Sequence, residues 1–187
     1  MTAFSADPDR LKHLAEALVD AARRAGADQA DALAVDGRSV GIDVRGGALE
    51  QAERAESVDI GLRVLIGGRQ AAVSSSDHSR DAIAQMAARA VAMAREAPVD
   101  DTLGLADPGQ LATIRDASGL RICDDLPEPE PAHLQDLALR AEAAALSVKG
   151  ISQIESANAS YSHRRMWMAA SNGFSGGYAR TGHVIST

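Results

Sequence analysis

Cysteine and long apolar runs are both scarce in this chain. One cysteine, Cys123, stands among 187 residues, so no internal disulfide can form, which is compatible with a reducing cytoplasm. No stretch reaches the roughly 18 consecutive apolar residues that a membrane-spanning helix needs. Charged residues such as Asp9 and Arg10 stand where a signal peptide would be apolar. We therefore expect a cytoplasmic protein with no membrane partner.

Basic residues are also in deficit, with 19 lysines and arginines against 26 acidic residues and a formal net charge of −7. Nucleic-acid-binding proteins normally show a basic excess, so we expect no nucleic-acid partner. Hydrophobic residues (45%) and charged residues (24%) are present in the proportions of an ordinary globular protein. The length predicts one domain, or one domain and a fragment.

Aromatic residues number only five, and four of them follow residue 160. The last acidic residue is Glu155, and the 32 residues after it contain three arginines and no carboxylate side chain. The aromatic side chains could fill a core otherwise built largely from 38 alanines, or they could form a contact surface for a partner or a peptide. The residues predicted at such a contact are Arg164, Trp167, Asn172, Gly173, Tyr178, Arg180 and His183.

Three segments have apolar residues at helical spacing. The predicted helices span 8–26, 79–97 and 131–149. Asp7 can cap the first helix, with Pro8 in its first turn, and Asp77 or Ser79 can cap the second. Pro131 opens the third helix, and the residues between the second and third helices form a long irregular connection.

Short strands with intervening turns are predicted in two regions. Residues 29–76 form an antiparallel meander of up to five strands, with turns at Asp36-Gly37, Gly46-Gly47 and Gly67-Gly68. Residues 151–187 form a C-terminal hairpin, in which a strand to residue 159 and a second to residue 170 precede an Asn-Gly turn. The sequence therefore predicts an α+β fold, with about three helices packed on a largely antiparallel meander sheet plus this hairpin.

The last residues read as a strand in progress, which would leave unpaired backbone groups at a sheet edge. We therefore expect residues 1–187 to be the N-terminal domain of a longer protein whose C-terminal domain is absent from the chain. A natural short form that ends on an edge strand is the alternative. Either form could also dimerise.

Zinc chemistry has little support in the sequence. A zinc hydrolase helix needs two histidines one turn apart with a glutamate beside the first, and none of the five histidines meets this pattern. His163 and His183 flank the predicted hairpin and could approach each other, but two ligands alone make a weak site. We predict no catalytic residue, no metal ligand and no cofactor in this chain. An independent metal-dependent enzyme that uses these two histidines is the weakest alternative.

The order of motifs resembles the PmbA/TldD family, and its PmbA (TldE) branch in particular. The resemblance includes the helix 79–97, the acidic linker and the Pro-started helix after it. The other two matching passages are GADQADALAVDGRSVGIDVRGGALEQAERAESVDIGLRVLIGGRQAAVSSSD and ISQIESANASYSHRRMWMAASNGFSGGYARTGHVIST. Each motif is a turn or a strand end, and the resemblance rests on their order over about 150 residues. It covers only the N-terminal part of such proteins, so it leaves the choice between the two branches open.

The resemblance implies a function that composition and spacing do not. TldD and TldE are cytoplasmic partners that form a heterodimeric zinc metallopeptidase for unfolded peptides, including precursors that mature by cleavage, and the family also carries the label of DNA gyrase modulator. TldD holds the zinc on a His-Glu-x-x-x-His helix, which this chain lacks. The chain would then be a scaffold that is inactive alone, with a TldD-like subunit and an unfolded peptide as partners. The alternative is a stand-alone peptide- or protein-binding module without hydrolysis.

Overall fold

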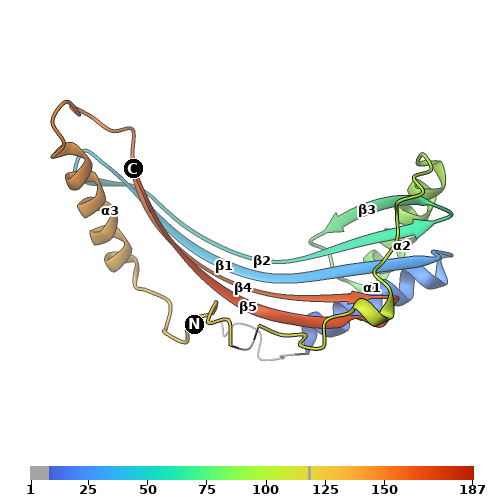
Figure 1. The fold of residues 1–187 in the computed structure, drawn as a ribbon. Coiled ribbons are helices and arrows are strands. Elements are labelled where there is room, and N and C mark those ends of the chain that lie inside the picture. Colours follow the sequence, from blue (N-terminus) through green and yellow to red (C-terminus); the bar gives the residue numbers. More distant parts are fainter. Residues whose placement is uncertain (1–8, 118) are drawn as a thin grey trace. The chain divides into compact units, whose positions relative to one another are not determined.

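The computed structural model describes residues 9–117 and 119–187. The elements are α1 (Arg10–Arg24), β1 (Gln29–Arg45), β2 (Ala48–Ile66), β3 (Arg69–Ser75), α2 (Arg80–Glu96), a 3₁₀ turn (Pro108–Gln110), α3 (Pro131–Leu146), β4 (Ala157–Ala170) and β5 (Ser175–Ser186) (Figure 1). The strands form one antiparallel sheet in the order β3–β2–β1–β4–β5. The predicted α+β class, with a meander, three helices and a C-terminal hairpin, is confirmed.

The chain divides into two compact units. Unit 1 contains the described residues of Met1–Asp36 and Ser57–Gly119, together with Arg165–Tyr178. Unit 2 contains Gly37–Glu56, Leu120–Arg164 and Ala179–Thr187. Four of the strands contribute residues to both units, and each unit has its own hydrophobic core.

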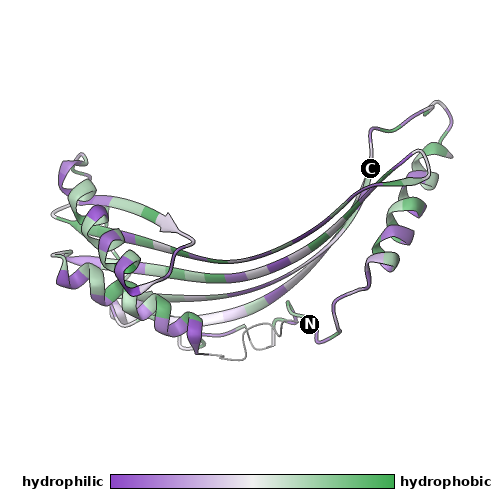
Figure 2. Cartoon of the chain, turned by 180° about the vertical axis from the view of Figure 1, so that it is seen from behind, coloured by the Kyte–Doolittle hydropathy of each residue, from purple (hydrophilic) through white to green (hydrophobic). Residues whose placement is uncertain are grey.

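In unit 1, α1 and α2 pack on one face of the sheet. Figure 2 shows hydrophobic and hydrophilic residues interleaved along both helices, as expected for helices with one buried side. Small side chains on β1 and branched ones on β2 meet these helices. The fully buried residues of this core include Ala15, Leu18, Ala22, Ala30, Ala34, Ile60, Leu62, Val64, Ala90 and Ala94. The abundant alanine thus serves close packing of helix on sheet.

The ends of the first two helices follow the sequence closely. Gly26 has a φ of +101° just after α1, which a glycine adopts without strain. Ser79 caps α2 by accepting the Ala82 N–H at 3.3 Å, and the Asp77 carboxylate accepts the Ser79 N–H at 2.9 Å. Asp7 and Pro8, which are predicted to begin the first helix, lie outside the described residues.

In unit 2, α3 supplies one side of a smaller core. The buried apolar residues are Val40, Ile42, Val44, Leu134, Ala138, Ala157, Ala159 and Tyr161. Glu142 of α3 is only 4% exposed, and its two carboxylate oxygens accept the N–H groups of Gly46 (2.6 Å) and Gly47 (2.8 Å). These glycines form the β1–β2 turn with φ values of +60° and +76°. A helix carboxylate therefore holds the predicted Gly46-Gly47 turn.

The predicted meander of up to five strands has three, and one of its predicted turns is wrong. Asp36-Gly37 makes no turn, because β1 continues through it, and β2 runs unbroken from Ala48 to Ile66. The Asp36 carboxylate accepts a hydrogen bond from Arg165 Nη2 of β4 at 2.6 Å. This contact holds Asp36 in an extended strand within the sheet, so the meander has two long strands, β1 and β2, and the short strand β3.

The C-terminal hairpin is shorter than predicted. Residues 151–156 are not a strand, and β4 begins at Ala157 and runs on without a break at residue 160. The Glu155 carbonyl oxygen accepts a hydrogen bond from Arg45 Nε at 2.6 Å in place of a strand partner. The third helix also ends early, at Leu146, and its last predicted turn is irregular up to Gly150, whose φ is +100°.

The long connection between α2 and α3 lies against the outer edge of β5. In unit 1, the Gly177 N–H donates to the Arg115 carbonyl oxygen at 3.0 Å. In unit 2, the Thr181 N–H donates to the Ile122 carbonyl oxygen at 3.1 Å. The connection therefore supplies backbone acceptors to an edge strand.

Candidate functional site

The predicted contact residues are divided between the two units. Unit 1 contains Trp167, Asn172, Gly173 and Tyr178, and unit 2 contains Arg164, Arg180 and His183. Each group has its own packing environment, and the role predicted for these residues in contacting a partner or peptide stays a prediction.

Trp167 is tied to the interior of unit 1. Its side chain packs against the buried core, and its Nε1 donates to Ser175 Oγ at 3.0 Å. Ser175 Oγ in turn donates to Glu16 Oε1 of α1 at 3.1 Å. The ring and its polar edge are therefore both engaged within the unit, which supports the core-filling interpretation for this aromatic residue.

Asn172 and Gly173 form the predicted β4–β5 turn. Gly173 has a φ of +92°, and Asn172 Oδ1 accepts the Phe174 N–H at 3.2 Å. Asn172 Nδ2 donates to the Ala106 carbonyl oxygen at 2.9 Å, and Arg115 Nη1 donates to the Gly173 carbonyl oxygen at 3.2 Å. The turn thus holds the preceding connection in place, and both residues have a structural task.

Tyr178 belongs to the sheet face that is opposite to α1 and α2. Side chains alternate along a strand, and Gly177 faces the Trp167 ring, so Tyr178 points to the other face. Leu33 and Met168 also point to this face, because their neighbours along the strands pack in the core on the helix side. These three side chains are 41% (Tyr178), 41% (Leu33) and 38% (Met168) exposed. We call this surface of unit 1 the open sheet face.

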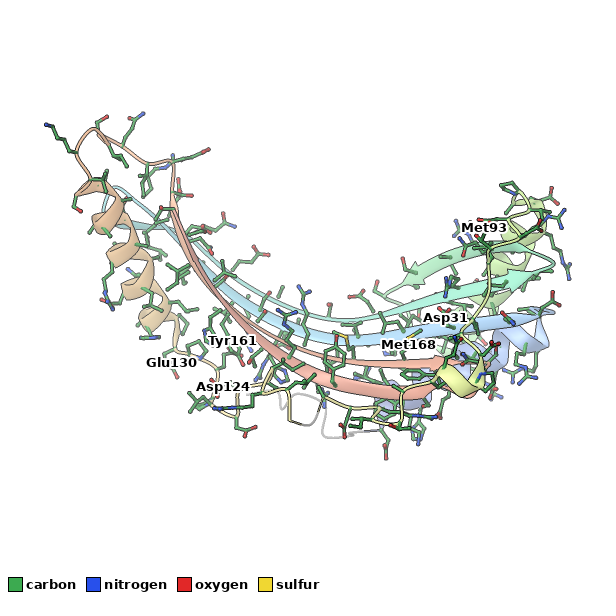
Figure 3. All side chains as sticks on the ribbon, viewed as in Figure 1. Asp31, Met93, Asp124, Glu130, Tyr161 and Met168 are labelled. Carbon is green, nitrogen blue, oxygen red and sulfur yellow. The ribbon has the colours of Figure 1, made fainter. Side chains whose placement is uncertain are left out.

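The register of β1 and β4 places two of these side chains together. Ser171 donates its N–H to the Ala30 carbonyl oxygen, and Asp36 pairs with Arg165. An antiparallel register that satisfies both contacts sets Leu33 opposite Met168. Figure 3 labels Met168 on β4 near the neighbouring strand β1. The open sheet face therefore has a continuous apolar strip across these strands.

A hollow of about 350 Å³ lies in the open sheet face next to this strip. It is lined by Asp31, Leu33, Gly61, Leu62, Arg63, Ala72, Val73 and Ser74. Gly61 has no side chain and pairs with Ser74, while Arg63 pairs with Ala72, so small residues leave the space. We call this space the sheet-face hollow.

One ion pair borders the sheet-face hollow. Arg63 Nε donates to Asp31 Oδ2 at 2.9 Å, and the Arg63 Nη2 group contacts the same oxygen. The side chains are 39% (Arg63) and 13% (Asp31) exposed. Because the two charges neutralise each other, the hollow suits an uncharged side chain better than a charged one.

In unit 2, all three predicted contact residues are exposed, and one of them, His183, also packs on a buried ring. The His183 ring lies 5.0 Å from the ring of the buried Tyr161, centroid to centroid, in an edge-on arrangement at 60°. Arg164 and Arg180 are exposed. His183 therefore has an aromatic packing partner, although its side chain is exposed like those of the two arginines.

The two histidines of the metal alternative have other neighbours. His163 Nε2 lies 3.7 Å from Cys123 Sγ, and His183 packs on Tyr161. Within residues 9–117 and 119–187, no group of three or more His, Cys, Asp or Glu side chains is arranged to hold a metal ion. In the same part of the chain, no helix is long and apolar enough to cross a membrane.

The sheet-face hollow was not found by sequence reasoning. Asp31, Gly61 and Arg63 were not singled out, although a glycine inside a strand pattern signals a missing side chain where something else can approach. Gly61 carried that signal. A Cβ there would meet only the Leu33 carbonyl oxygen at 4.0 Å, so the position is not closed by its neighbours.

Comparison with known proteins adds evidence on the family. Residues 30–94 match the model of PmbA/TldA metallopeptidase domain 1, and residues 124–187 match the model of the PmbA/TldA metallopeptidase central domain. No curated protein matches the chain in a sequence search.

Solved structures with the same fold are distant in sequence. A candidate modulator of DNA gyrase from Bacteroides thetaiotaomicron has a TM-score of 0.69 at 19% identity over 93% of this chain and 39% of its own. TldE from Thermococcus kodakarensis has a TM-score of 0.69 at 13% identity, with 91% and 37% covered. A candidate modulator of a DNA gyrase from Thermotoga maritima has a TM-score of 0.60 at 11% identity, with 93% and 38% covered.

This chain thus spans less than two fifths of the length of these structures. The two family models match consecutive parts of the sequence in domain order, and their ranges include most of the strands and α2. The chain belongs to the PmbA/TldD metallopeptidase family.

Proposed function

We propose that this chain is the N-terminal scaffold part of a PmbA/TldE-like, non-catalytic subunit in a TldD–TldE-type zinc metallopeptidase that cleaves unfolded peptides. The observation that carries this proposal is the match of two PmbA/TldA domain models in order along one chain. The likeness of fold to a TldE supports the TldE branch. The single cysteine fits a reducing cytoplasm, where we place the heterodimer.

The residues that the structure describes do not fit a zinc centre. The sequence has no His-Glu-x-x-x-His helix, and the described residues offer no group of three suitable ligands. We propose that the zinc and the hydrolytic step belong to the TldD-like partner. The task of this chain is to hold that partner and to shape the approach of an extended peptide.

We propose the open sheet face of unit 1 as the contact with the TldD-like subunit. Interface cores are enriched in aromatic residues and Met, and Tyr178 and Met168 are such residues. The Asp31–Arg63 pair is already formed, so covering it would leave no charge without a partner. The sheet-face hollow could then receive an apolar side chain of the partner.

Matched leucine variants test this surface. Leu33 (41% exposed) lies on the open sheet face, and Leu49 (50% exposed) lies on β2 in unit 2. The gene product is co-purified with the TldD-like subunit of the same genome as wild type, Leu33→Arg and Leu49→Arg. We expect Leu33→Arg to abolish co-purification and Leu49→Arg to preserve it. Equal binding by both variants would reject this face as the contact.

Activity measurements test the proposal as a whole. The chain alone should leave unfolded peptides intact, and addition of the TldD-like subunit to the complete gene product should produce cleavage that a chelator abolishes. Chelator-sensitive cleavage by the chain alone would contradict the scaffold role. Peptide capture without shortening, even with the partner present, would instead favour the stand-alone binding module.

A further inference from the structure

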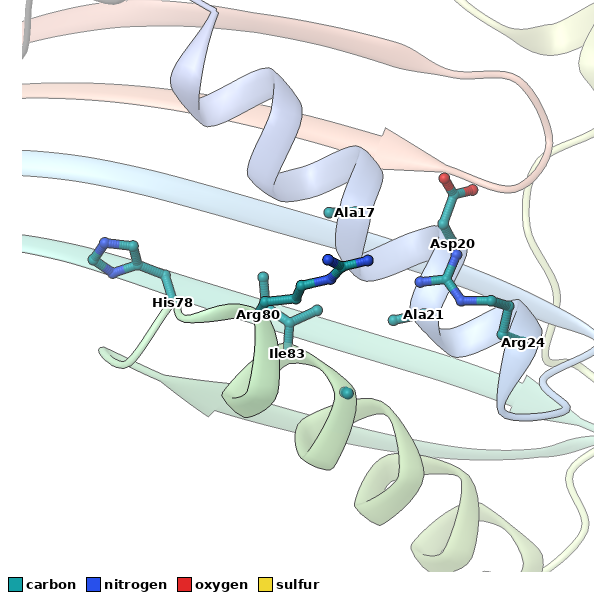
Figure 4. A pocket seen from close by; sticks show the side chains of 8 residues that line it. Ala17, Asp20, Ala21, Arg24, His78, Arg80 and Ile83 are labelled. Atoms are coloured by element: carbon teal, nitrogen blue, oxygen red, sulfur yellow. The ribbon is translucent and has the colours of Figure 1, made fainter.

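The two helices of unit 1 border a second pocket, which is partly open to solvent and lies on the opposite side of the sheet from the sheet-face hollow. Arg10 Nη2 of α1 lies 2.9 Å from His78 Nε2, just before α2, and Arg95 in the last turn of α2 lies beside Gly26 after α1. The helices therefore begin together and end together. A pocket of about 690 Å³ lies between them, lined by Ala17, Asp20, Ala21, Arg24, His78, Arg80, Ile83 and Ala84 (Figure 4). We call it the helix pocket.

The wall of the helix pocket is apolar and built from small side chains. Ala17 and Ala21 of α1 face Ile83 and Ala84 of α2 across it. Alanine side chains leave space where larger residues would fill the groove between two helices. The volume lies in the range of about 300–1,000 Å³ that is typical of small-molecule sites and far exceeds a single inorganic ion.

Two guanidinium groups converge at this pocket. Arg24, from the last turn of α1, and Arg80, from the first turn of α2, point toward each other in Figure 4. Both are exposed, and neither forms an ion pair with any residue that the structure describes. Like charges that converge repel each other, and an anion between them would remove this repulsion.

The remaining polar groups of the pocket do not cancel this positive charge. Asp20 is the one carboxylate among the lining residues, and in Figure 4 it points away from the gap between the arginines. His78 is held by Arg10. The pocket therefore has two unpaired cations against one anion, in a chain whose net charge is −7.

We propose that the helix pocket binds a small molecule that carries an oxyanion group, phosphate or carboxylate, on an apolar body. The forked guanidinium groups of Arg24 and Arg80 match the oxygen geometry of either group. The apolar body lies against the alanines and Ile83. This site is independent of the proposed contact with a TldD-like subunit.

Calorimetric titration of the complete chain with matched probes tests the ligand chemistry. The probes are phenyl phosphate, benzoate, inorganic phosphate and phenol. We expect phenyl phosphate or benzoate to bind, inorganic phosphate to bind more weakly, and phenol not to bind. The stronger of the first two identifies the preferred oxyanion, and the affinity falls as salt is added, because exposed charges are screened. Binding of phenol as strongly as the charged probes, or of none of the four, would overturn the proposal.

Variants locate the site. Arg80→Gln and Arg24→Gln should each lower the affinity for the preferred probe about tenfold. Arg89→Gln is the matched control, because Arg89 is an exposed arginine of the same helix outside the pocket, and it should leave the affinity unchanged. Asp20→Asn should strengthen binding, since it removes the opposing charge. Equal effects at Arg80 and Arg89, or weaker binding by Asp20→Asn, would refute the site.

A variant that fills part of the helix pocket tests the site without changing its charge. Ala84 is exposed at the pocket wall, so Ala84→Leu keeps a strong helix former and occupies space. We expect Ala84→Leu to weaken the binding of phenyl phosphate more than the binding of inorganic phosphate. An unchanged circular dichroism spectrum shows that the variant keeps the fold. Equal weakening of both probes would contradict the placement of the apolar body.

Discussion

Glu142 should be one of the most sensitive side chains of unit 2. It is 4% exposed, and its carboxylate accepts the N–H groups of Gly46 and Gly47 at 2.6 and 2.8 Å. Glu142→Gln keeps the shape but turns an NH₂ group toward one of these N–H groups. One charge-assisted bond becomes neutral, and the other N–H group, which lies in an exposed turn, must turn to water, which together should lower the free energy of unfolding by about 2 kcal/mol.

Asp136 provides the matched control on the same helix. Its ion pair with Arg140 is long, at 3.8 Å, and both side chains are largely exposed, at 64% (Asp136) and 73% (Arg140). Asp136→Asn should therefore change the stability by less than about 0.5 kcal/mol.

Urea unfolding measures the stability difference, and hydrogen exchange with mass spectrometry measures protection of the β1–β2 turn. In Glu142→Gln, the amides of Gly46 and Gly47 should exchange faster, while α1 and α2 keep their protection. The reasoning is refuted if Glu142→Gln and Asp136→Asn have the same unfolding midpoint and the same turn protection.

Three further predictions follow from particular contacts. Gly177→Ala would place a methyl group against the Trp167 ring, so we expect a loss of more than about 2 kcal/mol in urea unfolding and a shifted tryptophan emission, and an unchanged midpoint would contradict this packing. Asp36→Asn leaves the Arg165 guanidinium, whose side chain is 24% exposed, without its carboxylate, and should cost about 2 kcal/mol by the same assay, whereas wild-type stability would show that the pair contributes nothing. The Asp77 carboxylate accepts a hydrogen bond from the Ser79 N–H before α2, and this bond lowers the pKa of the carboxyl below 3.8. The contribution of Asp77 to stability is therefore present above that pH and is lost as the pH falls through the lowered pKa. Thermal melts of wild type and Asp77→Asn should therefore converge in acid, and a gap that widens in acid would contradict the assignment.

Local signals in the sequence predicted the elements of the fold that depend on neighbouring residues. Apolar spacing gave the helices, and the starts at Ser79 and Pro131 agree with the structure because capping and proline chemistry act within one turn. The turns at Gly46-Gly47 and Asn172-Gly173 were predicted for the same reason. Their positive φ angles are properties of the residues that form them.

Errors arose where a distant strand decides the local conformation. Asp36-Gly37 has the composition of a hairpin turn, yet Arg165 from β4 pairs with Asp36 and the strand continues. Glu155 likewise lies outside a strand because Arg45 engages its carbonyl oxygen. No local pattern contains these partners.

The candidate surfaces were harder to predict than the fold. Tyr178 was singled out for its aromatic ring, whereas Leu33 and Met168 of the same sheet face were not, because only the register of β1 and β4 sets these two side chains opposite each other. The convergence of Arg24 and Arg80 depends on the packing of two helices that are far apart in the sequence. Side chains that meet only through tertiary packing have no characteristic spacing in the sequence, so no local pattern predicts their contact.

The backbone bonds at Gly177 and Thr181 bear on how the protein behaves at high concentration. Sheets recruit further chains through strands that still have open amide groups, and this is how fibrous aggregates elongate. The carbonyl groups of Arg115 and Ile122 accept hydrogen bonds from the edge strand β5, so these two amide groups cannot pair with a strand of another molecule. Integrity of the connecting peptide thus protects solubility as well as tertiary structure.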